Sequence, residues 1–279
     1  MLNLYNIHRE REKMNQYVCM NGQISELEQA KIPVIDRGFL YGEAIAETLV
    51  AFDRTILSLE QHLNRLEQSA KQKDIRIHWK KDELEFQLLS LVDLIKSKKK
   101  YLRIIITSGN GFGLEYSSEA TNNIYIFGMP APIQNQEIYS NGIHLGIYKQ
   151  GFTNRESIAK TTQYSSRTMA YRQNKQNGFD DCLHVNLDGE ISEATSANIF
   201  LVERQGEHFQ LTTPALKSGI LKGITRDRII KICKDFDIHF VEKIIPLSNL
   251  AKFDEAFLSS SVKGLVPVSY THLTLPTKA

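Results

Sequence analysis

The chain has 279 residues, enough to bury a sizeable core in one large or two medium domains. Its 34 lysines and arginines nearly balance 32 acidic residues, so charge gives no reason to expect nucleic acid or an anionic membrane as a partner. No apolar stretch approaches the roughly 20 residues of a membrane-spanning helix, and the amino terminus lacks the apolar segment of a signal peptide. We therefore expect a cytoplasmic, two-lobed protein, and a role in small-molecule chemistry stays open.

Hydrophobic patterns in the first half predict a lobe of the α+β type. Apolar runs predict strands at 17–22, 44–52, 101–107 and 123–128, the last two joined by a Gly-rich hairpin loop. Two helices lie between them: Ser58 is expected to cap the first through a capping box, and Asp82 to cap the second. Their buried faces should consist of Leu59, Leu63, Leu66 and Ala70 in the first helix and Leu84, Leu88, Leu91, Val92 and Ile95 in the second.

A second, larger α/β lobe is expected after a proline-rich stretch that breaks every periodicity. Leu183, Val185 and Leu187 alternate up to an Asp-Gly turn, and 199–202 is predicted to be another strand. Residues 225–236 form the clearest helix, with Ile229, Ile230, Cys233 and Phe236 on one side. The predicted divisions are a non-native or disordered extension at 1–13, the α+β lobe at 14–130, a linker at 131–140, the α/β lobe at 141–267 and a foreign tail at 268–279.

The last residues resemble the translation of a transposase sequencing adapter, with VSYTHLTLPT at 268–277. The native sequence is therefore expected to stop near Pro267, before its own carboxyl terminus. No function is assigned to His272.

Several familiar sites do not fit their context. The glycines at 109–113 lack the following helix and the acidic residue of a dinucleotide site. The serines beside Lys160 lack the Gly-x-Ser-x-Gly elbow of hydrolases. Eight scattered histidines and three widely spaced cysteines predict neither a metal site nor a disulfide framework. We expect reduced, buried thiols and no metal centre.

Four groups of residues closely resemble, in order and spacing, the signature of class IV aminotransferases, which depend on pyridoxal 5'-phosphate. The resemblance covers roughly residues 14–267 and implies a D-amino-acid aminotransferase-like fold with pyridoxal phosphate as cofactor. The matching segments are DRGFLYG at 36–42 with ET at 47–48 and HLNRLEQSA at 62–70, IAKTTQY at 158–164 with NGFDD at 177–181 and DGEISEATSANIF at 188–200, GILKGITR at 219–226, and FLSSS at 257–261.

The resemblance also implies roles for individual residues. Lys160 is the lysine that forms the Schiff base and moves protons, chemistry that needs an amine able to lose its charge. Glu193 matches the acid that keeps the cofactor's ring nitrogen protonated. Arg65 matches the phosphate contact, helped by backbone amides at Ile224 and Thr225, where a helix begins. The remaining cofactor contacts implied are Tyr164 on the ring hydroxyl and Ser261 at the phosphate.

Substrate residues follow from a narrower resemblance. Tyr101 and Arg103 match a Tyr-x-Arg that branched-chain aminotransferases place in the substrate pocket, where Arg103 would bind a carboxylate of a substrate such as glutamate. An arginine on an amphipathic strand is equally compatible with a surface ion pair. Tyr41 is a further expected substrate contact. Ser108 stands where D-amino-acid aminotransferases have an arginine, which argues against that branch.

The predicted activity is transfer of an amino group between a branched-chain amino acid and 2-oxoglutarate. Ala46 and Val50 depart from the branched-chain pattern, so the pocket is expected to be wider or differently charged. A 4-amino-4-deoxychorismate lyase, which shares the lysine and the phosphate site, is the main alternative. A non-catalytic homologue is disfavoured because Lys160 and Glu193 are intact. The resemblance further implies a homodimer.

Overall fold

The computed structural model describes residues 15–115, 121–150 and 158–269. The chain divides into two compact units, one comprising Met1–Ile133 with Ala159–Gln163 and the other Gln134–Ile158 with Tyr164–Ala279. The first unit thus includes a short segment from the second half of the chain, and this segment contains Lys160. Sequence patterns did not predict this arrangement. The expected extension at 1–13 lies outside the described residues, as does most of the expected tail, from residue 270 onward.

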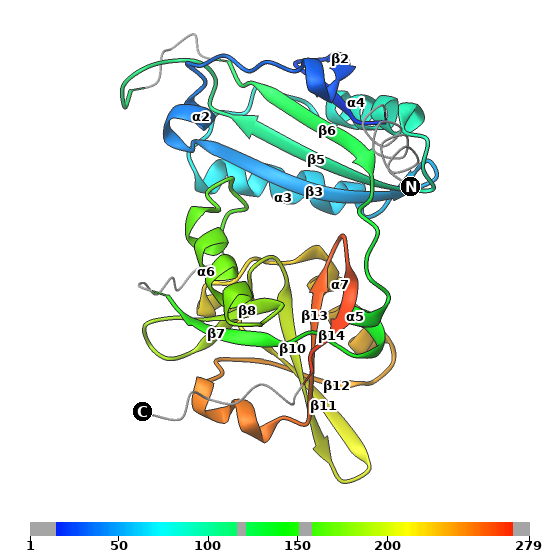
Figure 1. Cartoon of the computed structure of the whole chain (residues 1–279), viewed down its shortest axis with the longest axis vertical. Helices are drawn as coiled ribbons and strands as arrows, with labels where there is room; N and C mark the ends of the chain where they lie inside the picture. Colours follow the sequence, from blue (N-terminus) through cyan, green and yellow to red (C-terminus); the bar gives the residue numbers. More distant parts are fainter. Residues whose placement is uncertain (1–14, 116–120, 151–157, 270–279) are drawn as a thin grey trace. The chain divides into compact units, whose positions relative to one another are not determined.

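A six-stranded antiparallel sheet organises the first unit (Figure 1). Its order is β2-β1-β6-β5-β3-β4. The observed β3 coincides with the predicted strand, while β5 starts two residues earlier than expected. The strands are β1 Tyr17–Met20, β2 Gln23–Glu26, β3 Ala44–Phe52, β4 Thr55–Ile56, β5 Lys99–Thr107 and β6 Ile124–Pro130.

Two helices, α3 (Leu59–Gln72) and α4 (Lys81–Leu94), pack against one face of this sheet and bury its core. The predicted apolar faces are buried in both, and Leu59 is partly buried. Ser58 occupies the cap position of α3, as predicted, but its side chain makes no capping hydrogen bond, and the prediction that Asp82 caps α4 was wrong. Ser58 has a left-handed backbone (φ 53°) instead of the extended one that capping needs, because the chain turns directly from β4 into the helix. Asp82 lies inside the first turn of α4, where its charge still favours the helix dipole.

The remaining elements of the first unit are short. The helix α2 (Arg37–Tyr41) and the 3-10 turn η1 (Leu27–Gln29) precede β3. Asn21 and Gly22 both have positive φ and close the hairpin between β1 and β2.

The second unit contains two sheets, ordered β12-β11-β10-β13-β14 and β7-β8-β9. Two pairs, β7 with β8 and β11 with β12, are parallel, and the others are antiparallel. Both units therefore mix helices with sheets, which confirms the predicted fold class. The strands are β7 Leu145–Lys149, β8 Asp181–Val185, β9 Ile191–Ala194, β10 Asn198–Gln205, β11 His208–Pro214, β12 His239–Lys243, β13 Glu255–Ser260 and β14 Gly264–Pro267.

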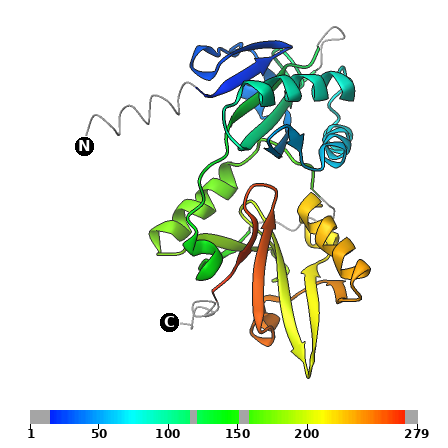
Figure 2. The same cartoon turned by 90° about the vertical axis from the view of Figure 1, so that its right-hand side faces the viewer.

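Helices cover these sheets. The helix α6 (Ser165–Gln176) packs against β7 and β8, and α7 (Ile224–Asp235) against β12 and β13 (Figure 2). The prediction that Phe236 lies on the buried side of α7 was wrong: the helix ends at Asp235, and the Phe236 side chain is 74% exposed. The other elements are α5 Glu137–Ser140, η2 Leu216–Ser218 and η3 Leu247–Lys252.

All three cysteines are free and buried, as expected. Within the described residues, none of the helices has both the length and the apolar character needed to cross a membrane.

Candidate functional site

Lys160 lies on a short segment that pairs with the edge of β3. The backbone amide of Ala46 donates a hydrogen bond to the carbonyl of Lys160 at 2.9 Å, and Ile45 faces Thr161 in an antiparallel bridge. On the helix side, the amide of Lys160 donates to Ser69 Oγ of α3 at 3.1 Å. The main chain of the predicted catalytic lysine is therefore held by a strand and a helix of the same unit.

Arg65, the predicted phosphate contact, is oriented by a buried carboxylate on β3. Its Nε and Nη2 donate to the two oxygens of Glu47 at 2.7 and 2.8 Å. His62 Nδ1 lies 2.7 Å from Glu47 Oε2, and both partners are almost completely buried. Sequence comparison singled out Glu47 only as part of a motif; the structure shows that it anchors Arg65.

Electrostatics keep this cluster in one charge state. Burial alone would raise the pKa of Glu47, but the hydrogen bonds from Arg65 and His62 outweigh it and lower that pKa to about 2. Burial lowers the pKa of His62 despite the opposing influence of Glu47. Since a carboxylate only accepts hydrogen bonds, Nδ1 of a neutral His62 carries the proton that Glu47 accepts.

Tyr101 and Arg103 lie on the face of β5 that points away from the helices. They are half-buried, whereas the alternate residues of β5 belong to the core. The register pairs Arg103 with Thr48 of β3. Ala46 lies two residues earlier on β3 and so shares that face, and its amide binds the carbonyl of Lys160. The main chain of Lys160 therefore meets β3 at the edge opposite the one that pairs with β5, the strand that carries the two predicted substrate residues.

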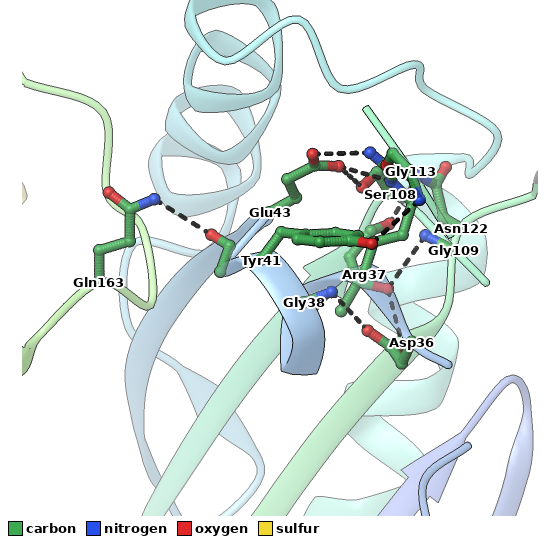
Figure 3. A network of polar contacts seen from close by, with 12 residues as sticks. Asp36, Arg37, Gly38, Tyr41, Glu43, Ser108, Gly109, Gly113, Asn122 and Gln163 are labelled. Atoms are coloured by element: carbon green, nitrogen blue, oxygen red, sulfur yellow. Dashed lines mark hydrogen bonds and ion pairs between the residues drawn. The ribbon is translucent and has the colours of Figure 1, made fainter. Parts of the chain in front are cut away.

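Tyr41 is held in a polar network at the end of α2 (Figure 3). Its hydroxyl accepts a hydrogen bond from the Gly113 amide at 3.0 Å, and the Arg37 guanidinium lies 5.0 Å from its ring centroid. Arg37 donates to both oxygens of Glu43 and to the Gly113 carbonyl, each at 2.8 Å. Ser108 Oγ also donates to Glu43, at 2.6 Å. The network ties the turn that carries Tyr41 to the loop after β5, and no sequence pattern indicated it.

Asp36 links the same turn to the sheet through hydrogen bonds. It is 1% exposed and accepts hydrogen bonds from the Gly38 amide and from three side chains, those of Thr107, Asn123 and Tyr125. Because all these donors lie on or beside the sheet, the Asp-Arg-Gly motif is fixed to it.

In the second unit, Glu193 on β9 is buried and accepts three hydrogen bonds. Its Oε1 accepts from Arg167 Nη2 at 2.6 Å. Its Oε2 accepts from Asn198 Nδ2 at 3.0 Å and from the backbone amide of Leu221 at 3.1 Å. The sequence motifs indicated Glu193 but none of these donors, although Asn198 and Leu221 lie inside the matching segments; Arg167 lies between two of them.

The start of α7 is joined to Glu193 through Asn198. Ile224 and Thr225 are the first two residues of the helix, and Gly223 precedes it in an extended conformation. A Cβ on Gly223 would lie 2.0 Å from Asn198 Oδ1, so the backbone passes close to this side chain. A buried carboxylate and a helix amino terminus suit a protonated ring nitrogen and a phosphate, the two ends of pyridoxal phosphate.

Two further predicted cofactor residues lie next to elements of the second unit. Tyr164 is half-buried and directly precedes α6, and Ser261 is half-buried in the turn between β13 and β14. Their roles stay predictions.

Gly223→Ala is expected to weaken binding of pyridoxal phosphate about tenfold or more, because the added methyl group must displace Asn198, which orders both Glu193 and the turn before α7. Spectroscopic titration of the cofactor-free protein measures this. Gly206→Ala, where a Cβ meets nothing within 4 Å but φ is +65°, measures how far backbone strain alone, away from the site, affects cofactor binding. Unchanged affinity in Gly223→Ala would contradict the prediction.

Known proteins share both sequence and fold with this chain. The family model for amino-transferase class IV matches residues 44–270. This chain belongs to the class IV aminotransferase family. A relative from Methanocaldococcus jannaschii, named "Putative branched-chain-amino-acid aminotransferase", is 30% identical over 252 residues, which are 90% of this chain and 86% of that protein.

Solved structures of class IV aminotransferases and related enzymes have the same fold. The branched-chain amino acid aminotransferase of Escherichia coli superposes with a TM-score of 0.81 at 25% identity, covering 91% of this chain and 85% of that one. The 4-amino-4-deoxychorismate lyase of Pseudomonas aeruginosa shares the fold with a TM-score of 0.77 at 23% identity, covering 90% of each chain. Other matched structures are pyridoxal-phosphate-bound forms, and pyridoxal phosphate is the cofactor of the family.

Proposed function

We propose that this aminotransferase transfers the amino group between a branched-chain amino acid and 2-oxoglutarate. The observation that carries the proposal is that β3 pairs on one side with β5, which bears Tyr101 and Arg103, and on the other side with the main chain of Lys160. The names of the relatives at 25–30% identity support the same substrate class.

The proposed roles assign the chemistry to particular side chains. Bound pyridoxal phosphate supplies the electron sink that makes the Cα proton of an amino acid removable. Lys160 Nζ binds the cofactor and, once released from it, takes the proton from Cα. The carboxylate of Glu193 accepts a hydrogen bond from the protonated ring nitrogen of the cofactor. Arg65 and the backbone amides of Ile224 and Thr225 hold the phosphate; the proposed additional contacts are Tyr164 at the ring hydroxyl and Ser261 at the phosphate.

The substrate would be bound by three residues of the first unit. Arg103 provides two parallel N–H groups for a carboxylate of the substrate. Such charge-assisted hydrogen bonds both attract the carboxylate and fix its orientation. Tyr41 and Tyr101 provide aromatic surface and a hydroxyl each. Since Arg37, Glu43 and Gly113 fix Tyr41, the shape of this part of the binding surface is set before substrate arrives.

We also propose that the enzyme is a cytoplasmic homodimer, by analogy with the family. Light scattering of the purified protein should give about twice the 31.9 kDa chain mass. A monomer mass at micromolar concentration would contradict this.

An absorbance experiment tests the function. The protein loaded with pyridoxal phosphate should change its spectrum when glutamate is added, and 2-oxo-4-methylpentanoate should restore it. Release of pyruvate from aminodeoxychorismate, with no response to glutamate, would instead identify a lyase. Reaction with D-alanine but not with L-amino acids would contradict the branched-chain assignment.

A further inference from the structure

Arg167 reaches from α6 to the end of β9 and is bound there by consecutive residues. It donates to Glu193 Oε1 at 2.6 Å and to the carbonyls of Ala194 and Thr195 at 3.3 and 3.0 Å. The side chains of Arg167 and Glu193 are 21% and 5% exposed. An arginine held by a carboxylate and two neighbouring carbonyls has a fixed orientation, unlike a solvent-exposed ion pair.

The groups beside this pair are neutral. Burial would lower the pKa of Arg167, but the attraction and hydrogen bond of Glu193 outweigh burial and raise it. Burial, helped by the charge of Arg167, lowers the pKa of His184 to about 4. Burial also raises the pKa of Cys182 to about 11. At neutral pH, the guanidinium of Arg167 therefore lies beside two uncharged side chains, those of His184 and Cys182.

The hydrogen bonds divide the two carboxylate oxygens between different donors. Arg167 binds Oε1, while Asn198 and the amide of Leu221 both bind Oε2. A carboxylate has about four acceptor positions, so three protein donors leave capacity for one more. The divided contacts fix the plane of the carboxylate, and removal of the donor on Oε1 would free it to rotate.

We propose that Arg167 is a positioning residue for the cofactor: it holds Glu193 as an oriented carboxylate that accepts the N–H of the cofactor's ring nitrogen. The inference rests on the role proposed above for Glu193. Without Arg167, a buried carboxylate loses its cationic partner, which is strongly unfavourable. Glu193 would then reorient, and the ring nitrogen would lose an aligned acceptor.

The test compares two ligands of the full chain freed of cofactor. One is pyridoxal phosphate, and the other is its analogue with C–H in place of the ring nitrogen. The wild-type protein should prefer pyridoxal phosphate about tenfold or more, the value of one charge-assisted hydrogen bond. Arg167→Met should lose most of this preference, as should Glu193→Gln. Arg167→Lys, which keeps the charge with fewer donors, should retain part of it.

Arg172 on the same helix is exposed, and Arg172→Met serves as the matched control with an unchanged preference. If Arg167 had only a structural role, Arg167→Met would bind both ligands more weakly but by the same factor. The inference would be overturned if Arg167→Met preferred pyridoxal phosphate as strongly as the wild type does. It would also be overturned if Arg167→Lys lost the whole preference. If the wild type shows no preference, both the inference and the role of Glu193 fail. If pyridoxal phosphate does not bind at all, the proposed function fails with them. Thermal unfolding of the cofactor-free variants identifies any that do not fold. If Arg167→Met does not fold, the ligand preference of Arg167→Lys decides whether the inference holds.

Discussion

Replacing Lys160 by alanine is expected to lower the rate of amino-group transfer about 10⁴-fold or more while leaving the fold intact. In the proposed roles of Lys160, the variant loses both the covalent link to the cofactor and the base that moves the Cα proton, and general acid–base catalysis alone contributes about 10²–10⁴-fold. The fold is retained because Ser69 and Ala46 bind the main chain of Lys160, which alanine preserves. Steady-state rates with glutamate and 2-oxo-4-methylpentanoate, together with the melting temperature, measure both effects.

Two further variants sharpen this experiment. Lys160→Arg keeps a positive charge but cannot form the Schiff base, so it should be as inactive as Lys160→Ala. Lys71→Ala removes an exposed lysine from α3 and should leave the rate within about twofold of wild type. An unchanged rate in Lys160→Ala would refute the assignment of this residue.

Replacing Glu47 by alanine is expected to lower the free energy of unfolding by about 3–5 kcal/mol at pH 7. The carboxylate is the shared acceptor of Arg65 and His62, and removal of one partner from a buried ionic cluster leaves the others without compensation. Urea denaturation measures the loss. Glu47→Gln keeps the shape and should fall between wild type and alanine. A loss below about 1 kcal/mol in Glu47→Ala would show that the cluster is not stabilising.

The same carboxylate predicts a pH dependence. The pKa of Glu47 is about 2 in the folded protein and 4.5 in its reference state. A depressed folded pKa means that the stabilisation is fully present above about pH 4.5 and is lost as pH falls towards 2. The stability difference between Glu47 and Glu47→Gln should therefore shrink across this window. His62 is hydrogen-bonded to Glu47 and is itself titratable, so the pair is compared in a His62→Gln background. A difference that does not vary with pH would contradict the assignment.

Local patterns predicted the elements of this protein well. The strand β3 has the predicted limits, and the helical spacing of Leu63, Leu66 and Ala70 gave the buried face of α3, because one face of each element must be apolar to pack. The failures occurred at helix ends. Asp82 and Phe236 were misplaced, and Ser58 occupies the cap position without a side-chain capping bond, because a cap or a last turn depends on the direction in which the chain arrives or leaves.

The sequence by itself determined the family, the cofactor and the two residues on which the chemistry was predicted to depend, Lys160 and Glu193, because short motifs keep their order and spacing along the chain. Only the tertiary structure decided which groups surround them. Glu47 meets Arg65 across 18 positions, Arg167 meets Glu193 across 26, and Ser69 meets Lys160 across 91. Such contacts depend on how strands and helices pack, since residues far apart along the chain become neighbours only when hydrophobic burial brings their elements together.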